Sequence, residues 1–140
     1  MPSLQPSAGG AGAASAALRI VSGAMFVCHG AQKLLGWPPP AHIVDTGSQL
    51  WIGGLIEIVC GTLIALGLFT RLAALLASGT MAVAYFQFQW QVHEAGALAN
   101  WKFLPIVNKG ETAVLYCFIF LMFAIAGAGP YSLDARRRRM

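Results

Sequence analysis

Charged residues are scarce in this chain. Only 10% of its 140 residues are charged, whereas an average soluble domain has about 25%. Hydrophobic residues make up 57%, and the mean hydropathy is +0.65. The formal net charge of +4 comes largely from the last residues, Arg136 to Arg139. A nucleic-acid surface needs basic residues spread over a folded face, so no nucleic-acid partner is expected.

Motifs for metal, phosphate or thiol chemistry are also missing. The three cysteines form no C-x-x-C pair, the three histidines form no H-x-x-x-H pair, and no Gly-rich phosphate loop occurs. No metal site is therefore predicted, and no catalytic residue is identified. A haem held by His29 and His93 stays open as an alternative, although isolated histidines near a membrane interface are common.

The chain does have four apolar segments, at residues 16–35, 50–68, 72–90 and 112–128. Each is about long enough to cross a bilayer as a helix. Because hydrocarbon offers no hydrogen bonds to the backbone, such segments must be helical. We therefore expect an all-α integral membrane bundle of four transmembrane helices over residues 16–130. Residues 1–15 are expected to form a disordered tail, and residues 131–140 a basic tail.

Positive charges predict the orientation in the membrane. Four spans place both termini on one side, together with Arg19, Arg71 and the four C-terminal arginines. The three lysines, Lys33, Lys102 and Lys109, fall on the other side. Because cytoplasmic loops carry an excess of Lys and Arg, both termini are expected to be cytoplasmic. The half of the bundle near the termini is expected to be small and apolar.

Polar side chains gather in the opposite, outer half. Glu57 lies about 10 Å inside the second segment, at a depth similar to that of His29. An ion pair between Lys33 and Glu57 would make both groups tolerable there. We predict a polar pocket lined by candidates from all four helices: His29, Gln32, Lys33, Glu57, Tyr85, Gln89 and Glu111. The alternative is that these groups only satisfy one another inside the bundle.

Local patterns supply several further expectations. Tyr85, Gln89 and His93 recur every four residues and should share one helix face. Gly67 is suited to end the second helix, and Thr70 to cap the third. Small residues four apart, such as Gly61 and Ala65, are expected at helix contacts. The loop that includes His42 and the long loop 94–111 are expected on the outer side.

Several short motifs together resemble one known family. They are His29-Gly-Ala-Gln-Lys-Leu-Leu-Gly-Trp37, Gly53-Gly-Leu-Ile-Glu57, Gly67-Leu-Phe-Thr-Arg71, Asn108-Lys-Gly-Glu111 and Gly129-Pro-Tyr-Ser-Leu-Asp134. In this order and spacing they resemble the DoxX family of small bacterial membrane proteins. The run Pro38-Pro-Pro40 departs from the Gly-rich loop that the family often has there. The resemblance implies four helices in the bacterial cytoplasmic (inner) membrane.

The resemblance implies function only in outline. The family name comes from the small subunit of a thiosulfate:quinone oxidoreductase, and other members resemble partners of redox or thiol-stress enzymes. We therefore expect an accessory or membrane-anchor subunit that docks a redox enzyme or a quinone within the lipid bilayer. Two alternatives stay open: a subunit that itself passes electrons to quinone, and a small-molecule carrier. No cofactor is visible in the sequence, and the oligomeric state is left open.

Overall fold

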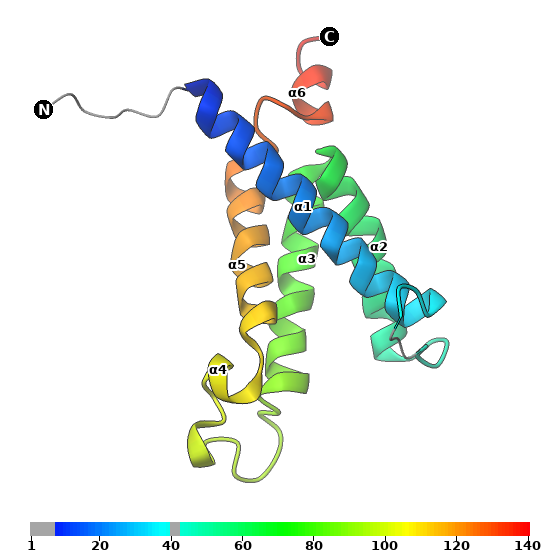
Figure 1. The fold of residues 1–140 in the computed structure, drawn as a ribbon, viewed down its shortest axis with the longest axis vertical. Helices are drawn as coiled ribbons and strands as arrows, with labels where there is room; N and C mark the ends of the chain where they lie inside the picture. The colour runs from blue at the N-terminus through cyan, green and yellow to red at the C-terminus, as the bar shows by residue number, and fades with distance from the viewer. Residues whose placement is uncertain (1–7, 40–42) are drawn as a thin grey trace, which may run out of the picture.

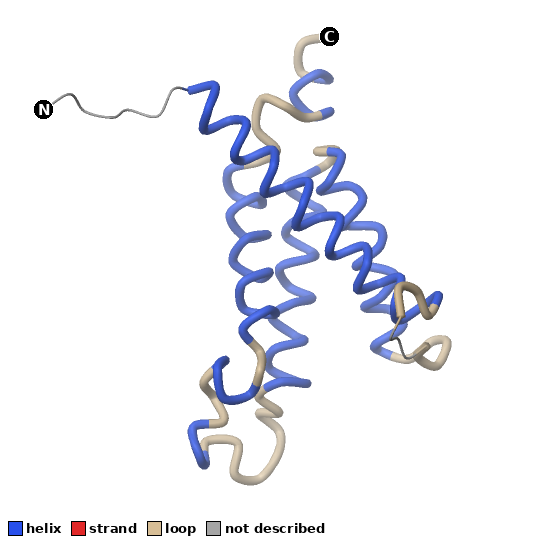
Figure 2. The backbone as a smooth tube through the Cα atoms, in the orientation of Figure 1, coloured by secondary structure: helices blue, strands red, loops and turns tan. Residues whose placement is uncertain are grey.

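The structure is a computed structural model, and it describes residues 8–39 and 43–140. Within these residues every regular element is a helix (Figure 1 and Figure 2). Four elements carry the bundle: α1 (Ala8–Leu35), α2 (Gln49–Leu66), α3 (Thr70–Ala84) and α5 (Glu111–Ala126). The π-helix η1 (Tyr85–Gln89) extends α3, and the short pieces are η2 (Ala99–Trp101), α4 (Pro105–Asn108) and α6 (Leu133–Arg137).

In the described part of the chain, three helices are long and apolar enough to cross a membrane, namely Gly9–Leu35, Gln49–Leu66 and Thr70–Gln89. The fourth apolar segment forms α5, whose 16 residues span about 24 Å, somewhat less than a hydrocarbon core of about 30 Å. The predicted all-α membrane class is confirmed, with a fourth helix that is shorter than the other three.

The bundle consists of two helix pairs, α1 with α2 and α3 with α5. The pairs lie together near α6 and diverge toward the opposite end (Figure 1). We call these the terminal end and the loop end. Small residues allow α1 and α2 to touch: a Cβ on Gly23 would lie 2.7 Å from the Gly61 carbonyl oxygen and 3.0 Å from the Ala65 side chain. The predicted contact role of Gly61 and Ala65 is confirmed.

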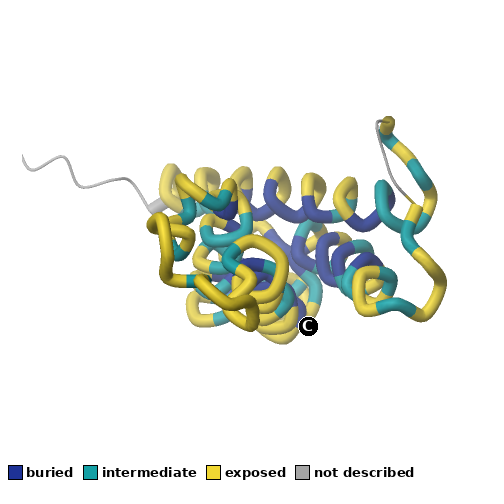
Figure 3. The backbone as a smooth tube through the Cα atoms, turned by 90° about the horizontal axis from the view of Figure 1, so that it is seen from below, coloured by how far each residue is buried: buried dark blue, intermediate teal, exposed yellow. Residues whose placement is uncertain are grey.

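Aromatic side chains fill the space between the pairs. Phe26, Phe120 and Phe123 are fully buried against small residues of α3 such as Ala74 and Ala77. The outward turns of the helices are exposed (Figure 3), and they carry large apolar side chains such as Leu72. This apolar exterior suits lipid, because in water it would associate with other apolar surfaces.

Helix α1 begins earlier in the chain than the sequence predicted. Helix α1 begins at Ala8, so residues 8–15 belong to it, and residues 1–7 lie outside the described part. Alanine-rich sequence has the highest helix propensity. Gly12 also packs against the C-terminal segment, since a Cβ there would lie 2.9 Å from Pro130 Cγ.

The predicted stripe of Tyr85, Gln89 and His93 is wrong. The Trp90 N–H donates to the Tyr85 carbonyl at 2.8 Å, a five-residue spacing that widens the last turn into η1. This turn places successive residues differently from an α-helix, and the helix ends before His93. Tyr85 is buried, whereas Gln89 and His93 are exposed.

The terminal half is not purely apolar, contrary to the prediction. Arg19 of α1 is 1% exposed. Its Nη1 donates to the carbonyls of Ile64 and Ala65 at 2.6 and 2.8 Å, and its Nη2 donates to the Tyr131 carbonyl at 2.8 Å. The Ile64 and Ala65 carbonyls lie at the end of α2, which a left-handed Gly67 terminates as predicted. Arg19 thus ties α1, α2 and the C-terminal segment together.

The C-terminal segment is a folded part of the bundle, not only a basic tail. The two carboxylate oxygens of Asp134 accept hydrogen bonds from the N–H groups of Phe69 and Thr70, each at 2.9 Å. The Asp134 N–H in turn donates to the Gly67 carbonyl at 2.8 Å. Thr70 is therefore not the cap of α3, because the cap comes from Asp134, far along the chain.

Candidate ligand pocket

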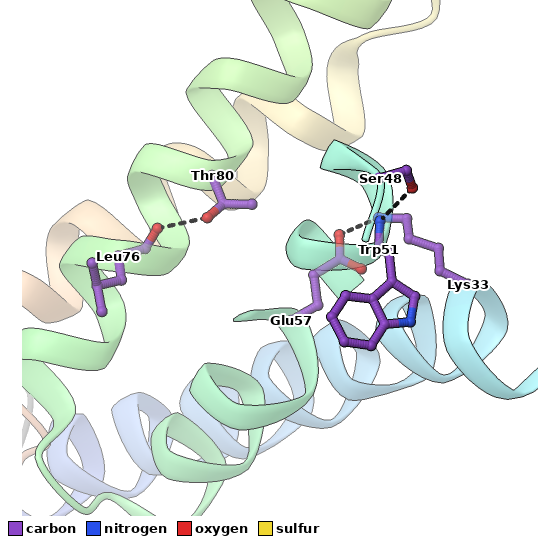
Figure 4. A network of polar contacts seen from close by, with 6 residues as sticks. All are labelled: Lys33, Ser48, Trp51, Glu57, Leu76 and Thr80. Carbon is purple, nitrogen blue, oxygen red and sulfur yellow. Dashed lines mark hydrogen bonds and ion pairs between the residues drawn. The ribbon is translucent and has the colours of Figure 1, made fainter. Parts of the chain in front are cut away.

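An ion pair lies near the loop end, between α1 and α2. Lys33 Nζ is 2.5 Å from Glu57 Oε1 (Figure 4), which confirms the predicted partnership. Glu57 is 1% exposed, whereas the Lys33 side chain keeps 29% of its exposure. The contact depends on Gly30, where a Cβ would lie 2.5 Å from the Gly54 carbonyl oxygen and 3.0 Å from Glu57 Cβ. Close approach of the two helices therefore brings the lysine to the carboxylate.

The second carboxylate oxygen, Glu57 Oε2, is buried and has no hydrogen-bond partner. The hydroxyl of Tyr116, on α5, is in the same condition, and this residue is 6% exposed. Buried polar atoms without partners are rare in folded proteins and call for an explanation. Glu57 and Tyr116 both line one cavity of about 180 Å³.

The cavity lies between the two helix pairs. Lys33, Glu57, His29 and Gln89 supply its polar lining from three different elements. Its other walls are Phe26, Met81, Ala84, Thr112, Ala113 and Tyr116. Four of the seven residues that the sequence offered as candidates therefore lie around one space.

The other three candidates have separate roles. The Tyr85 hydroxyl donates to the Phe103 carbonyl at 2.6 Å and so fixes the long loop. The Gln32 amide donates to the Pro38 carbonyl at 3.0 Å. Glu111 is exposed as the first residue of α5, where a carboxylate interacts favourably with the helix dipole. His42, which the sequence placed in the first outer loop, lies outside the described residues.

Tyr116 is the pocket residue that sequence reasoning missed. It sits in a run of apolar residues, and only its hydroxyl distinguishes it from core packing. Its ring stacks on Phe120 at a centroid distance of 5.4 Å and meets the His29 ring edge-on at 6.0 Å. The signal available in the sequence was a tyrosine inside an apolar membrane segment, because a hydroxyl in that environment normally needs a hydrogen-bond partner.

Two further cavities adjoin this one. A space of about 230 Å³ between α2 and α3 shares Lys33, Glu57 and Met81 with it, and Thr80 lies across from the ion pair (Figure 4). The Thr80 hydroxyl is engaged, since it donates to the Leu76 carbonyl at 2.9 Å. A third, more apolar groove of about 230 Å³ between α1 and α5 shares Tyr116. The polar cavity therefore has an apolar neighbour on either side.

These groups define what the cavity can bind. Glu57 Oε2 can accept a hydrogen bond, and the Tyr116 hydroxyl can donate or accept one. The apolar walls suit a flat or chain-like molecule of limited polarity. Within the described residues, no group of three or more His, Cys, Asp or Glu is placed to hold a metal ion.

The fold and this site define an all-helical integral membrane protein with a polar cavity between two helix pairs. The chain belongs to the DoxX family, whose model matches residues 14–90. It is 45% identical to an uncharacterized protein of Haemophilus influenzae over 124 residues, covering 84% of this chain and 85% of that protein. It is 30% identical to an uncharacterized membrane protein of Mycobacterium tuberculosis over 136 residues, covering 85% and 78%. No solved structure matches it significantly.

Proposed function

We propose that this protein is an accessory or membrane-anchor subunit of a redox system in the bacterial cytoplasmic membrane, and that its cavity binds a lipid-soluble ring such as a quinone. One observation carries the binding proposal. Two buried oxygen atoms, Glu57 Oε2 and the Tyr116 hydroxyl, lack partners, and both residues line the same cavity.

A quinone matches this lining in both of its forms. The Tyr116 hydroxyl and the Gln89 amide can donate to a ring carbonyl, and Glu57 can accept from the hydroxyl of the reduced form. Lys33 balances the carboxylate charge, so a neutral ligand leaves the site neutral. The apolar groove between α1 and α5, lined by Leu18, Val21, Met25, Leu115 and Ile119 among others, suits an apolar tail that leaves past Tyr116.

A carrier is the second candidate. Cavities lie on both sides of the Lys33–Glu57 pair, between α2 and α3 and between the helix pairs. A molecule that moves from one cavity to the other would pass this pair. Transport into proteoliposomes distinguishes a carrier from a binding subunit, because a static site accumulates nothing.

Binding is tested with purified full-length protein and a short-tailed quinone analogue, titrated by calorimetry in a neutral detergent. Tyr116→Phe removes one hydrogen bond, so we expect about tenfold weaker affinity. The melting temperature should stay the same or rise, since the lost hydroxyl has no protein partner. Tyr131→Phe at the terminal end is the matched control. Wild-type affinity in Tyr116→Phe, or no binding by the wild type, would contradict the proposal.

The accessory role needs its own experiment. Purification from the native host in mild detergent, with mass-spectrometric identification of bound proteins and lipids, should recover a redox enzyme. Flavin or haem absorbance that stays with this chain after the partner is removed would favour the alternative of an electron-passing subunit.

A further inference from the structure

A second polar cavity lies at the terminal end, away from the proposed quinone site. Its volume is about 370 Å³, and it is enclosed by the start of α3, the backbone after α5, and α6. Arg71, Arg138 and Arg139 line it, and Asp134 is the one acidic residue in its lining. Three cations facing one anion leave the cavity positive by two charges.

The carboxylate of Asp134 is already occupied. Both of its oxygens accept backbone N–H groups at the start of α3. Among residues 8–39 and 43–140 the one ion pair is Lys33–Glu57, so Arg71, Arg138 and Arg139 have no carboxylate partner. Unpaired cations that converge from distant parts of the chain suit an anionic ligand.

The four C-terminal arginines have different surroundings. The guanidinium of Arg137 lies 4.8 Å from the centre of the Phe69 ring. Arg136 lines a separate groove, together with Arg19. Only Arg138 and Arg139 join Arg71 at the cavity. This division separates a specific site from the general attraction of a basic tail to anionic lipid.

We propose that this cavity binds a phosphate-bearing anion. The planar guanidinium group presents paired N–H donors whose spacing matches two phosphate oxygens. Arg71 is followed by Leu72 and, one turn further along α3, by Leu75, whose side chains are 62% and 56% exposed. The cavity thus sits where the apolar exterior gives way to polar surface, the level of phospholipid headgroups. A lipid headgroup and a soluble phosphate share this chemistry.

The test uses the full-length chain in neutral detergent at fixed ionic strength. Dihexanoyl phosphatidylglycerol and inorganic phosphate are titrated separately by calorimetry. The double change Arg138→Gln with Arg139→Gln should weaken binding at least about tenfold. The matched control, Arg136→Gln with Arg137→Gln, removes the same charge from the same segment and should change affinity by less than about twofold. Arg71→Gln should also weaken binding, although it lies outside the tail.

Every outcome bears on the site. Tighter binding of the lipid than of inorganic phosphate assigns a headgroup, whereas equal affinity assigns a soluble phosphate; both support the proposal. Equal losses in the two double variants, or no saturable binding of either probe, would overturn it. Arg138→Lys with Arg139→Lys keeps the charge and should recover part of the affinity. Circular dichroism of each variant shows that helix content is unchanged.

Discussion

Lys33 and Glu57 are joined at 2.5 Å across α1 and α2, yet the second oxygen of Glu57 has no partner. The pair therefore joins the two helices through one carboxylate oxygen and leaves the other oxygen without a partner. Its strength is testable, because either partner alone is an isolated charge in a low-dielectric interior.

Glu57→Gln should destabilise the protein by roughly 3–5 kcal/mol if Lys33 stays buried, and by less if its amine reaches the interface. Lys33→Met combined with Glu57→Gln should recover much of this loss, because no unpaired charge remains. A double-mutant cycle measures the interaction: thermal unfolding in detergent is compared for the wild type, both single variants and the double variant. Additive losses would mean that the two side chains do not interact.

Tyr85 and Gln89 should respond in opposite ways. Tyr85→Phe breaks the hydrogen bond to the Phe103 carbonyl, at a cost of about 1 kcal/mol, and should loosen the loop without changing ligand affinity. Gln89→Leu alters the cavity lining and should weaken binding of the quinone analogue with little change in stability. Limited proteolysis of the loop and calorimetric titration measure the two effects. Weaker binding of the quinone analogue by Tyr85→Phe would show that Tyr85 contributes to the binding site.

Asp134 should stabilise the start of α3. Asp134→Ala leaves the N–H groups of Phe69 and Thr70 without an acceptor and should cost about 1–2 kcal/mol, the size of a lost helix cap. The matched control is Asp45→Ala, because Asp45 is an exposed aspartate in the loop before α2. An unfolding temperature equal to that of the control would contradict the capping role.

The same contact predicts a dependence on pH. Burial by itself would raise the pKa of Asp134, but the hydrogen bonds from Thr70 and Phe69 and the nearby Arg137 outweigh burial and lower the pKa. A lowered pKa in the folded state means that the stabilisation is present above the unfolded value of about 3.9 and is lost as the pH falls through the folded value. Between about pH 5 and pH 2 the advantage of wild type over Asp134→Asn should therefore shrink. A constant difference across this range would rule out the linkage.

Gly61 should not tolerate a side chain. A Cβ there would lie 2.7 Å from the Gly23 carbonyl oxygen, a backbone atom that cannot move away alone. Gly61→Ala should cost about 1–3 kcal/mol as the helices separate. Gly79→Ala is the matched helical control, because a Cβ there has no heavy atom within 4 Å. Equal unfolding temperatures for the two variants would contradict the close contact.

Orientation in the membrane is tested by fusion. Alkaline phosphatase inserted at Gly96, in the long loop, should be active, and the enzyme fused after Met140 should be inactive, because the excess of Lys and Arg lies at the terminal end. The reverse pattern would place the termini outside.

The sequence predicted the helices and one key contact for clear physical reasons. Apolar runs of membrane length require helices, because the backbone has no other hydrogen-bond partner in lipid. Glu57 and Lys33 lie at similar depth in neighbouring helices, and two opposite charges in a low dielectric must meet.

Other features needed the three-dimensional structure. The π-turn at Tyr85–Gln89 shifts the helix register, which no periodicity rule anticipates, and the helix ends before His93. The Tyr85 hydroxyl binds the Phe103 carbonyl, and Tyr85 is not part of the cavity lining. Tyr116 joins the pocket because of how the helix pairs diverge, and nothing around it in the sequence shows that its hydroxyl lacks a partner.

The sequence by itself thus determined that this protein lies in a membrane, that it is helical and that it contains the Lys33–Glu57 pair. These features follow from the hydropathy and the charge of each segment taken separately. The tertiary structure alone decided that Arg19 is buried, that Asp134 caps α3, and that the C-terminal arginines separate to different places. Those outcomes depend on contacts between residues far apart in the chain, and such contacts exist only once the helix pairs have packed.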